Sequence, residues 1–158
     1  MEPIIQTSPT PPVHAVTRAD GHVVSDERAR LDMDYVHRSL TTTYWALQRS
    51  RAQTERSWAH CCGFGVYAPS GGLVGFGRLL TDFTFRAHLG DVFIDPACRG
   101  LGLGKFLVET ILAHPELAGV QHWSLTTQDA HGLYARHGFT LGERDGRWMT
   151  LDRGLPPA

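Results

Sequence analysis

One stretch, residues 91–105 (DVFIDPACRGLGLGK), decides the fold. It begins as a short apolar strand, turns at Pro96, and continues into three glycines at alternate positions with Arg99 ahead of them. A helix follows, with apolar residues repeating on one face at helical spacing: Leu103, Phe106, Leu107 and Ile111. Because glycine has no Cβ, the amide N–H groups at the start of this helix face open space at the positive end of the helix dipole. The stretch therefore predicts a site for a phosphate or pyrophosphate.

The size and composition are those of one soluble domain. The chain has 158 residues, of which 42% are hydrophobic and 20% charged, and its formal net charge is -1. That balance gives no basic face for nucleic acid, and no apolar run is long enough to cross a membrane. The three cysteines, Cys61, Cys62 and Cys98, have no metal-ligand spacing. We therefore expect free thiols, no metal, and a cytoplasmic protein without a secretory signal.

The first half of the chain predicts a leader and two helices. Residues 1–20 are rich in Pro, Thr and Ser and are expected to be a flexible leader, so that the domain spans residues 21–154. A first strand is expected at 22–25. Asp32 is expected to cap a short helix that runs to Leu40. A second helix is expected to begin at Trp45 or Ser50 and to end near residue 60.

The second half predicts a sheet with two further helices. Residues 64–67 and 73–80 flank a Pro-Ser-Gly-Gly turn and read as a β-hairpin, and 83–85 and 91–94 are expected to continue the sheet. A strand at 122–127 and a helix from Asp129 to a C-cap at Gly138 follow. A closing hairpin is expected from 139–141 and 148–151. This order predicts α/β or α+β layers around one mixed sheet.

Two well-known phosphate loops do not fit residues 99–105. A P-loop needs a glycine five residues before its Gly-Lys pair and Ser or Thr after the lysine, where this chain has Arg99 and Phe106. A dinucleotide fingerprint needs Gly-x-Gly-x-x-Gly early in a βαβ unit, whereas the glycines here alternate and lie late in a small chain.

The loop instead resembles that of the GNAT N-acetyltransferase superfamily, whose Arg/Gln-x-x-Gly-x-Gly/Ala motif cradles the pyrophosphate of acetyl-CoA. The preceding residues 92–96 are similar to the strand that enters this loop, and 130–139 (AHGLYARHGF) resemble the family's Ala-x-x-Leu-Tyr-x-x-x-Gly-Phe segment. The resemblance covers about residues 23–151. It implies a single GNAT-type domain with a central mixed, mostly antiparallel twisted sheet flanked by about four helices.

The resemblance also implies which residues bind the cosubstrate. Backbone groups of the strand would hold the pantetheine arm and polarise the thioester carbonyl, and amides of the loop would bind pyrophosphate. Many relatives have Asn seven residues before the motif's tyrosine, where this chain has Thr127. Lys105 either adds a charge near the pyrophosphate or is a solvated lysine of the first turn. The predicted acetyl-CoA contacts are Val92, Phe93, Ile94, Arg99, Gly100, Leu101, Gly102, Leu103, Gly104, Lys105, Thr127, Asp129 and Tyr134.

Two catalytic roles follow from the same resemblance. Tyr134 matches the tyrosine beside the CoA sulfur, where a phenol can act as general acid; without the motif it would be a core aromatic. An amine must lose a proton before it attacks, so a base is needed. Asp91 is the predicted base because burial would perturb its pKa, although it could instead cap a turn. His88, Asp82 and His131 remain alternatives.

The acceptor is expected between the early helices and the central strands. The predicted contacts are Tyr44, Trp45, Arg78, Asp82 and Phe85, with Arg49 nearby. These side chains suit a small amine with an apolar or aromatic body, or the arginines could hold a carboxylate of an amino-acid-like acceptor. Trp45 and Phe85 could also simply close the core.

The leading hypothesis is an acetyl-CoA-dependent N-acetyltransferase that acts on a small-molecule primary amine by direct attack in a ternary complex. The alternatives are a CoA-binding or sensing module without transfer, and a transferase that uses another acyl-CoA or a protein amine. A homodimer is a further possibility that the family suggests.

Overall fold

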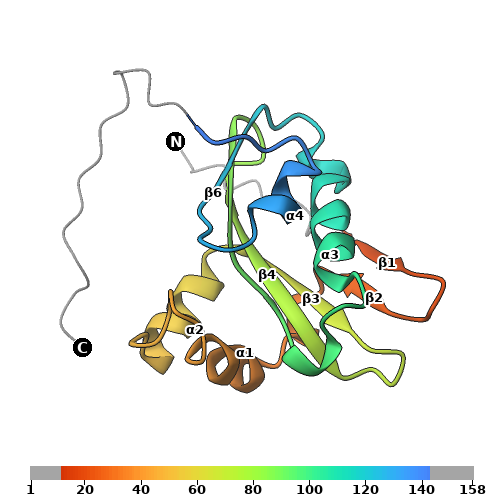
Figure 1. The fold of residues 1–158 in the computed structure, drawn as a ribbon, viewed down its shortest axis with the longest axis vertical. Coiled ribbons are helices and arrows are strands. Elements are labelled where there is room, and N and C mark those ends of the chain that lie inside the picture. The colour runs from red at the N-terminus through yellow and green to blue at the C-terminus, as the bar shows by residue number, and fades with distance from the viewer. Residues whose placement is uncertain (1–11, 143–158) are drawn as a thin grey trace, which may run out of the picture.

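The computed structural model describes residues 12–142, in which helices cover both faces of one sheet (Figure 1). The strands are β1 (Ala15–Thr17), β2 (Val23–Ser25), β3 (Cys62–Tyr67), β4 (Leu73–Thr81), β5 (Arg86–Ile94) and β6 (His122–Leu125). The helices are α1 (Met33–Leu40), α2 (Arg51–Ala59), α3 (Leu103–Leu112) and α4 (His131–Ala135), with 3-10 turns at Arg28–Arg30, Pro96–Cys98 and Pro115–Leu117. No helix in this part of the chain is long and apolar enough to span a membrane.

The strands lie side by side in sequence order. Each neighbouring pair from β1 to β5 is antiparallel, whereas β5 and β6 are parallel. This confirms the mixed, mostly antiparallel sheet. The sheet begins earlier than we expected, because β1 lies inside the segment 1–20 that we assigned to a leader. There Val16 pairs with Val24 and packs on the core.

Caps decide where the first two helices begin. Asp32 caps α1 as predicted, since its Oδ1 accepts hydrogen bonds from the amides of Asp34 and Tyr35 at 2.9 and 3.0 Å. Of the two expected starts of α2, the structure has Ser50, which forms a capping box with Gln53. Trp45 therefore lies in the connection between α1 and α2 and not in a helix.

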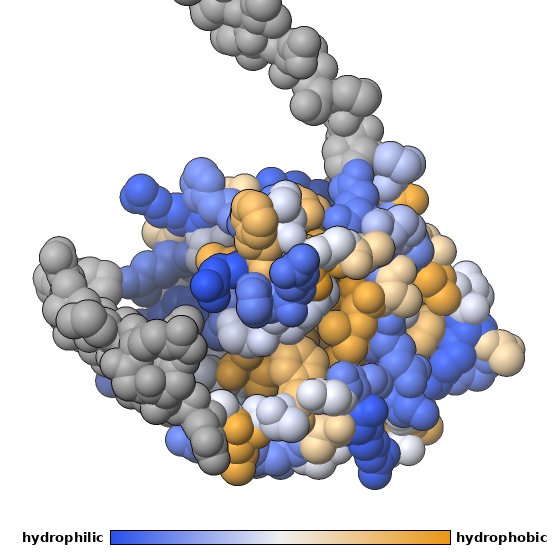
Figure 2. Space-filling view, turned by 90° about the horizontal axis from the view of Figure 1, so that it is seen from above, coloured by the Kyte–Doolittle hydropathy of each residue, from blue (hydrophilic) through white to orange (hydrophobic). Residues whose placement is uncertain are grey.

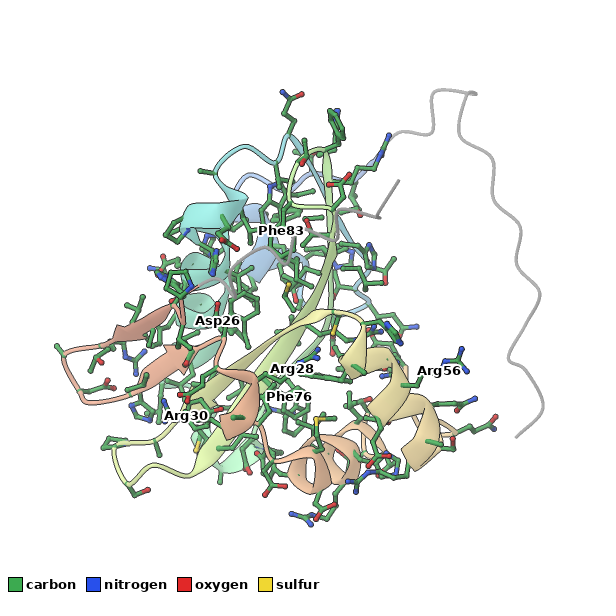
Figure 3. All side chains as sticks on the ribbon, turned by 180° about the vertical axis from the view of Figure 1, so that it is seen from behind. Asp26, Arg28, Arg30, Arg56, Phe76 and Phe83 are labelled. Atoms are coloured by element: carbon green, nitrogen blue, oxygen red, sulfur yellow. The ribbon has the colours of Figure 1, made fainter. Side chains whose placement is uncertain are left out.

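Two apolar clusters hold the layers together. One lies under α3 and includes Phe64, Leu79 and Leu107, and the other lies under α1 and α2. In the second cluster Phe76 stacks on Phe93 with ring centroids 5.1 Å apart, and Figure 3 shows Phe76 on the sheet beside these helices. Arg28 closes the end of α2 by donating to the carbonyls of residues 58, 59 and 61 (Figure 3).

A β-bulge interrupts the central strand at Asp91. Phe76 pairs with Phe93 but Arg78 pairs with Gly90, so two residues of β5 lie opposite one residue of β4. Asp91 takes the extra position with φ 51, a left-handed conformation that Asp tolerates better than most residues. The bulge changes which residues of β5 face α3. Before the bulge these are the odd-numbered Ala87 and Leu89, and after it they are the even-numbered Val92 and Ile94.

The prediction of a strand at residues 83–85 is wrong. These residues form the tight connection between β4 and β5, and β5 starts at Arg86. The cause is Asp82, whose Oδ1 accepts hydrogen bonds from the amides of Thr84, Phe85 and Arg86 and so bends the backbone away from a ladder.

The last predicted helix is shorter than expected. It begins at His131 and not at Asp129, because Thr127 Oγ1 accepts from the amide of Ala130 at 3.0 Å and holds the preceding turn. The helix also ends earlier than expected, with Arg136 and not Gly138 as its C-cap. Gly138 lies two residues further on and has a left-handed φ of 87. Residues 139–141 are not in a strand, and their expected partner at 148–151 lies outside the described residues.

Candidate active site

Strands β5 and β6, the last two strands of the described sheet, pair over only part of the length of β5. Their pairing ends at Leu89 and Leu125, whereas β5 continues to Ile94. The β6 side of residues 91–94 therefore has no strand partner among residues 12–142, and an extended ligand could add to this edge as a strand would. This is the backbone that we expected to hold pantetheine. Val92 faces a cavity there, whereas the side chain of Phe93 is buried in the core.

The glycine loop enters α3 through two glycines with left-handed backbone. Gly100 and Gly102 have φ values of 81 and 72, and Gly102 is the N-cap of α3. Leu103 is buried, so only its backbone can take part. The ammonium of Lys105 lies 3.6 Å from Glu109 on the exposed helix surface. Arg99 donates from Nε to the carbonyl of Ile94 at 3.4 Å and so links the loop to β5.

Sequence reasoning missed Arg18, which supports this loop from the β1–β2 connection. Its Nη1 donates to the carbonyl of Leu101 at 2.9 Å, and its guanidinium lies 5.5 Å from the ring centroid of Phe106. Arg18 also pairs with Asp20. No local pattern near Arg18 signals this contact, because the two bonded groups are 83 positions apart in the chain.

A cavity of about 450 Å³ lies where β5 and β6 separate. Its walls come from the α1–α2 connection, β4, β5 and the β6–α4 connection. It brings together eight of the predicted site residues: Tyr44, Trp45, Arg78, Asp91, Val92, Thr127, Asp129 and Tyr134. Arg49, His88 and Gln128 also line it.

Two predicted acceptor contacts do not line this cavity. Asp82 and Phe85 lie in the β4–β5 connection, where Asp82 is occupied by backbone amides and Phe85 is exposed. Figure 2 views the molecule from this end and shows apolar surface beside hydrophilic surface; Figure 3 places Phe83 at the same end, away from α1 and α2. We expected these two residues beside the acceptor because we assumed that residues 83–85 continue the sheet, which they do not.

Tyr134 lines the cavity and is 7% exposed. Burial raises its pKa to about 12, with further contributions from Tyr44 and Asp129. The phenol is therefore protonated at neutral pH and can donate a hydrogen bond. It also packs against Phe139, so the core position and the cavity position are compatible.

Asp91 is held by two arginines. Arg49 donates from Nη1 and Nη2 to the two carboxylate oxygens at 2.5 and 3.2 Å, and Arg78 donates from Nε at 2.7 Å. Burial acts to raise the pKa of Asp91, but the Arg49 hydrogen bonds and the two positive charges outweigh it and hold the pKa below its ordinary value. We expected a pKa perturbed in a direction useful to a base. The direction found is opposite, because both guanidinium groups reach the carboxylate.

His88 is the other base candidate that lines the cavity, whereas Asp82 and His131 do not. Its Nδ1 lies 2.9 Å from Ser124 Oγ on β6. Burial and then the charge of Arg78 lower its pKa, so the imidazole is neutral at pH 7 and can accept a proton.

Tyr44 joins two walls of the cavity. Its hydroxyl accepts a hydrogen bond from the amide of Gln128 at 3.1 Å. Its ring packs edge-on against Trp45, with the two ring centroids 4.8 Å apart. Within residues 12–142, no group of three or more His, Cys, Asp or Glu side chains is placed to hold a metal ion.

Comparison with known proteins agrees with this geometry. Residues 32–139 match the acetyltransferase (GNAT) family model. Serotonin N-acetyltransferase 2, chloroplastic, of Oryza sativa subsp. japonica is 34% identical over 108 residues, which are 68% of this chain and 52% of that protein. The chain spans about half the length of the curated relatives it matches.

Solved structures show the same relationship. A GNAT-family protein from Xanthomonas campestris pv. campestris has a TM-score of 0.77 and 38% identity, covering 94% of this chain and 96% of that one. A protein from Mycobacterium tuberculosis, solved in complex with CoA, has a TM-score of 0.62 and 25% identity over 76% of this chain and 72% of that one. With the family model matching more than half of its residues, the chain belongs to the acetyltransferase (GNAT) family.

Proposed function

We propose that the protein transfers an acetyl group from acetyl-CoA to a primary amine of a small molecule, by direct attack while both substrates are bound. The observation that carries this proposal is one cavity that joins the open edge of β5 at Val92 to Tyr134 on one side and to Tyr44, Trp45 and Arg78 on the other. A donor and an acceptor could therefore meet within it. The rice relative is named for serotonin, a primary amine, which supports an amine as the acceptor.

The donor side would be held by backbone. Amides of the loop around Gly100 and Gly102 would bind pyrophosphate at the start of α3, and the β5 edge would bind the pantetheine arm. Acetyl-CoA supplies an activated thioester. An amide of the β5 edge near Val92 would hydrogen-bond the thioester oxygen as negative charge develops there.

The proton path uses two residues of the cavity. His88 would take the proton that the amine loses as its nitrogen bonds to the carbonyl carbon, and Tyr134 would donate to the sulfur as the C–S bond breaks. Because a phenol with a pKa of about 12 is a weaker acid than a thiol, the hydrogen bond to sulfur contributes more than complete proton transfer. We propose His88 in place of Asp91 as the base, since Asp91 is engaged by Arg49 and Arg78.

The cysteines support direct transfer. Within the described residues Cys61, Cys62 and Cys98 are free and partly buried, and none lines the cavity. Burial raises the pKa of Cys61 to about 11, so it is a poor nucleophile at neutral pH.

The test is release of CoA from acetyl-CoA across a panel of primary amines, with the acetylated amine identified by mass spectrometry. We expect release that depends on both the amine and the enzyme. Reactions without amine control for hydrolysis and for the protein's own thiols. Binding of acetyl-CoA without turnover of any amine would contradict the proposal and would indicate a CoA-binding module.

A further inference from the structure

Three charged side chains from distant segments meet on one wall of the cavity. Arg49 comes from the α1–α2 connection, Arg78 from β4, and Asp91 from the bulge of β5. The Asp91 side chain is 3% exposed, and those of Arg49 and Arg78 are 20% and 16% exposed. All three are therefore largely removed from solvent.

The charges in this group do not balance. Two guanidinium groups face one carboxylate, so one positive charge stays uncompensated in a half-closed space, which is costly without a partner. His88 adds no charge because its imidazole is neutral at pH 7. Asp129 also lines the cavity, but it is exposed and comes from the β6–α4 connection. An anion bound beside the arginines would complete the group.

Arg78 has the geometry to bind that anion. Among residues 12–142, its side-chain hydrogen bond uses Nε, which donates to Asp91. Its two terminal nitrogens then remain for a ligand, and their planar arrangement matches the two oxygens of a carboxylate. Asp91 fixes the plane of the guanidinium, so little conformational entropy is lost when a ligand binds.

We infer that the acceptor is an amino acid or a close analogue, a primary amine that also carries a carboxylate, and that Arg78 binds this carboxylate. The inference rests on the proposed function. One excess positive charge matches a carboxylate better than a doubly charged phosphate. Trp45 and Tyr44 line the same cavity, and their aromatic rings could contact the acceptor's side chain.

Pairs of acceptors that differ by the carboxylate alone test this inference. We would measure kcat/KM for tryptophan and tryptamine, tyrosine and tyramine, and lysine and cadaverine, at about pH 8, where His88 is neutral. A fourth set, β-alanine, phosphoethanolamine and ethanolamine, distinguishes a preference for a carboxylate from a preference for a phosphate. We expect the carboxylated member to be preferred by about 10- to 100-fold in the pairs that the enzyme uses.

Variants assign the preference to Arg78. In Arg78→Gln the preference should fall to within about threefold of unity through loss of kcat/KM for the amino acid, while Arg78→Lys should retain part of it. Arg86→Gln is the matched control, since Arg86 is exposed at the start of β5 and does not line the cavity. The wild-type comparison needs no variant, so a folding defect in Arg78→Gln would not obscure the answer.

The possible results distinguish failure of the carboxylate inference from failure of the proposed function. Equal or better use of the amines without carboxylate would overturn the inference and leave the acetyltransferase proposal intact. Preference for phosphoethanolamine over β-alanine would contradict the inference that the bound group is a carboxylate. Bound acetyl-CoA with no turnover of any acceptor would overturn the proposed function and the inference with it.

Discussion

The donor side and the acceptor side of the cavity are built in different ways. The donor side is one continuous stretch in which the end of β5, a glycine loop and the start of α3 follow each other within residues 92–105. The acceptor side takes Tyr44, Arg78 and Asp91 from segments that are far apart in the chain. A continuous site can be recognised by its local pattern, whereas an assembled site depends on how the whole sheet packs.

The largest expected effect lies where the two sides meet. Tyr134→Phe should lower kcat by about 10²- to 10⁴-fold, because the sulfur loses its hydrogen-bond donor as the C–S bond breaks. The dissociation constant of acetyl-CoA should change little. Steady-state kinetics and calorimetry measure the two quantities. Tyr67→Phe is the control, since the Tyr67 hydroxyl is buried without a partner among the described residues and does not line the cavity; turnover unchanged in Tyr134→Phe would remove the proposed acid.

On the acceptor side, we expect Asp91 to stabilise the fold, because it binds two arginines from other segments of the chain. Asp91→Asn should lower the free energy of unfolding by about 1–3 kcal/mol at pH 7, because Arg49 and Arg78 lose a charged acceptor. Asn also tolerates the left-handed backbone at this position, so the change isolates the charge. Urea unfolding measures it.

The loss of stability caused by Asp91→Asn should depend on pH. The folded pKa of Asp91 is depressed, so its contribution is present above the unfolded pKa, about 4, and is lost as pH falls through the lower folded pKa. The difference between wild type and Asp91→Asn should therefore be constant above about pH 5 and shrink below pH 4. Asp34→Asn breaks an exposed ion pair with Arg51 and should change stability little. Equal effects of the two variants would contradict a buried role for Asp91.

The donor side should respond to backbone conformation. Gly102→Ala places a Cβ on a left-handed residue at the N-cap of α3, at a cost of about 1–2 kcal/mol. If the loop moves to relieve this strain, the dissociation constant of acetyl-CoA rises by about tenfold. Gly119→Ala is the matched control, because Gly119 has open space around it and no left-handed φ. Unchanged acetyl-CoA binding by Gly102→Ala would show that the loop conformation does not set affinity.

The smallest expected effect tests whether the donor side is truly local. Arg18→Ala removes the hydrogen bond to Leu101 and should raise the KM for acetyl-CoA by about two- to tenfold, with kcat preserved. Arg30→Ala, which removes an arginine that packs on Tyr67 far along the chain from the loop, should leave KM unchanged. A fall in kcat without a change in KM would contradict a role for Arg18 in supporting the loop.

Predictions from sequence succeeded where the signal was short-range. The cap at Asp32, the hairpin at residues 64–80 and the helix that follows the glycine loop each depend on a few neighbouring residues, and the structure has them. The strand at 83–85 failed because Asp82 makes three hydrogen bonds to the backbone that compete with the ladder. Apolar alternation alone does not reveal such competition.

The expectation for Asp91 failed for a different reason. We expected Asp91 at the start of an apolar strand. It lies instead at a bulge within β5, where it is buried, and the direction of its pKa shift depends on which charges face it. Arg49 is 42 positions away and reaches Asp91 because the α1–α2 connection folds over the bulge. His88 could be named as a candidate from sequence, but its place in the cavity required the pairing of β5 with β6.

The sequence by itself determined the hairpin at residues 64–80, the glycine loop and the helix that carries Tyr134. Each of these is specified by the periodicity and conformational preferences of adjacent residues. Only the tertiary structure decided that β5 bulges at Asp91, that β5 and β6 separate beside it, and that two arginines and a histidine share the resulting cavity. The physical reason is that charge pairing and burial act through space, and they join residues whose separation along the chain carries no local signal.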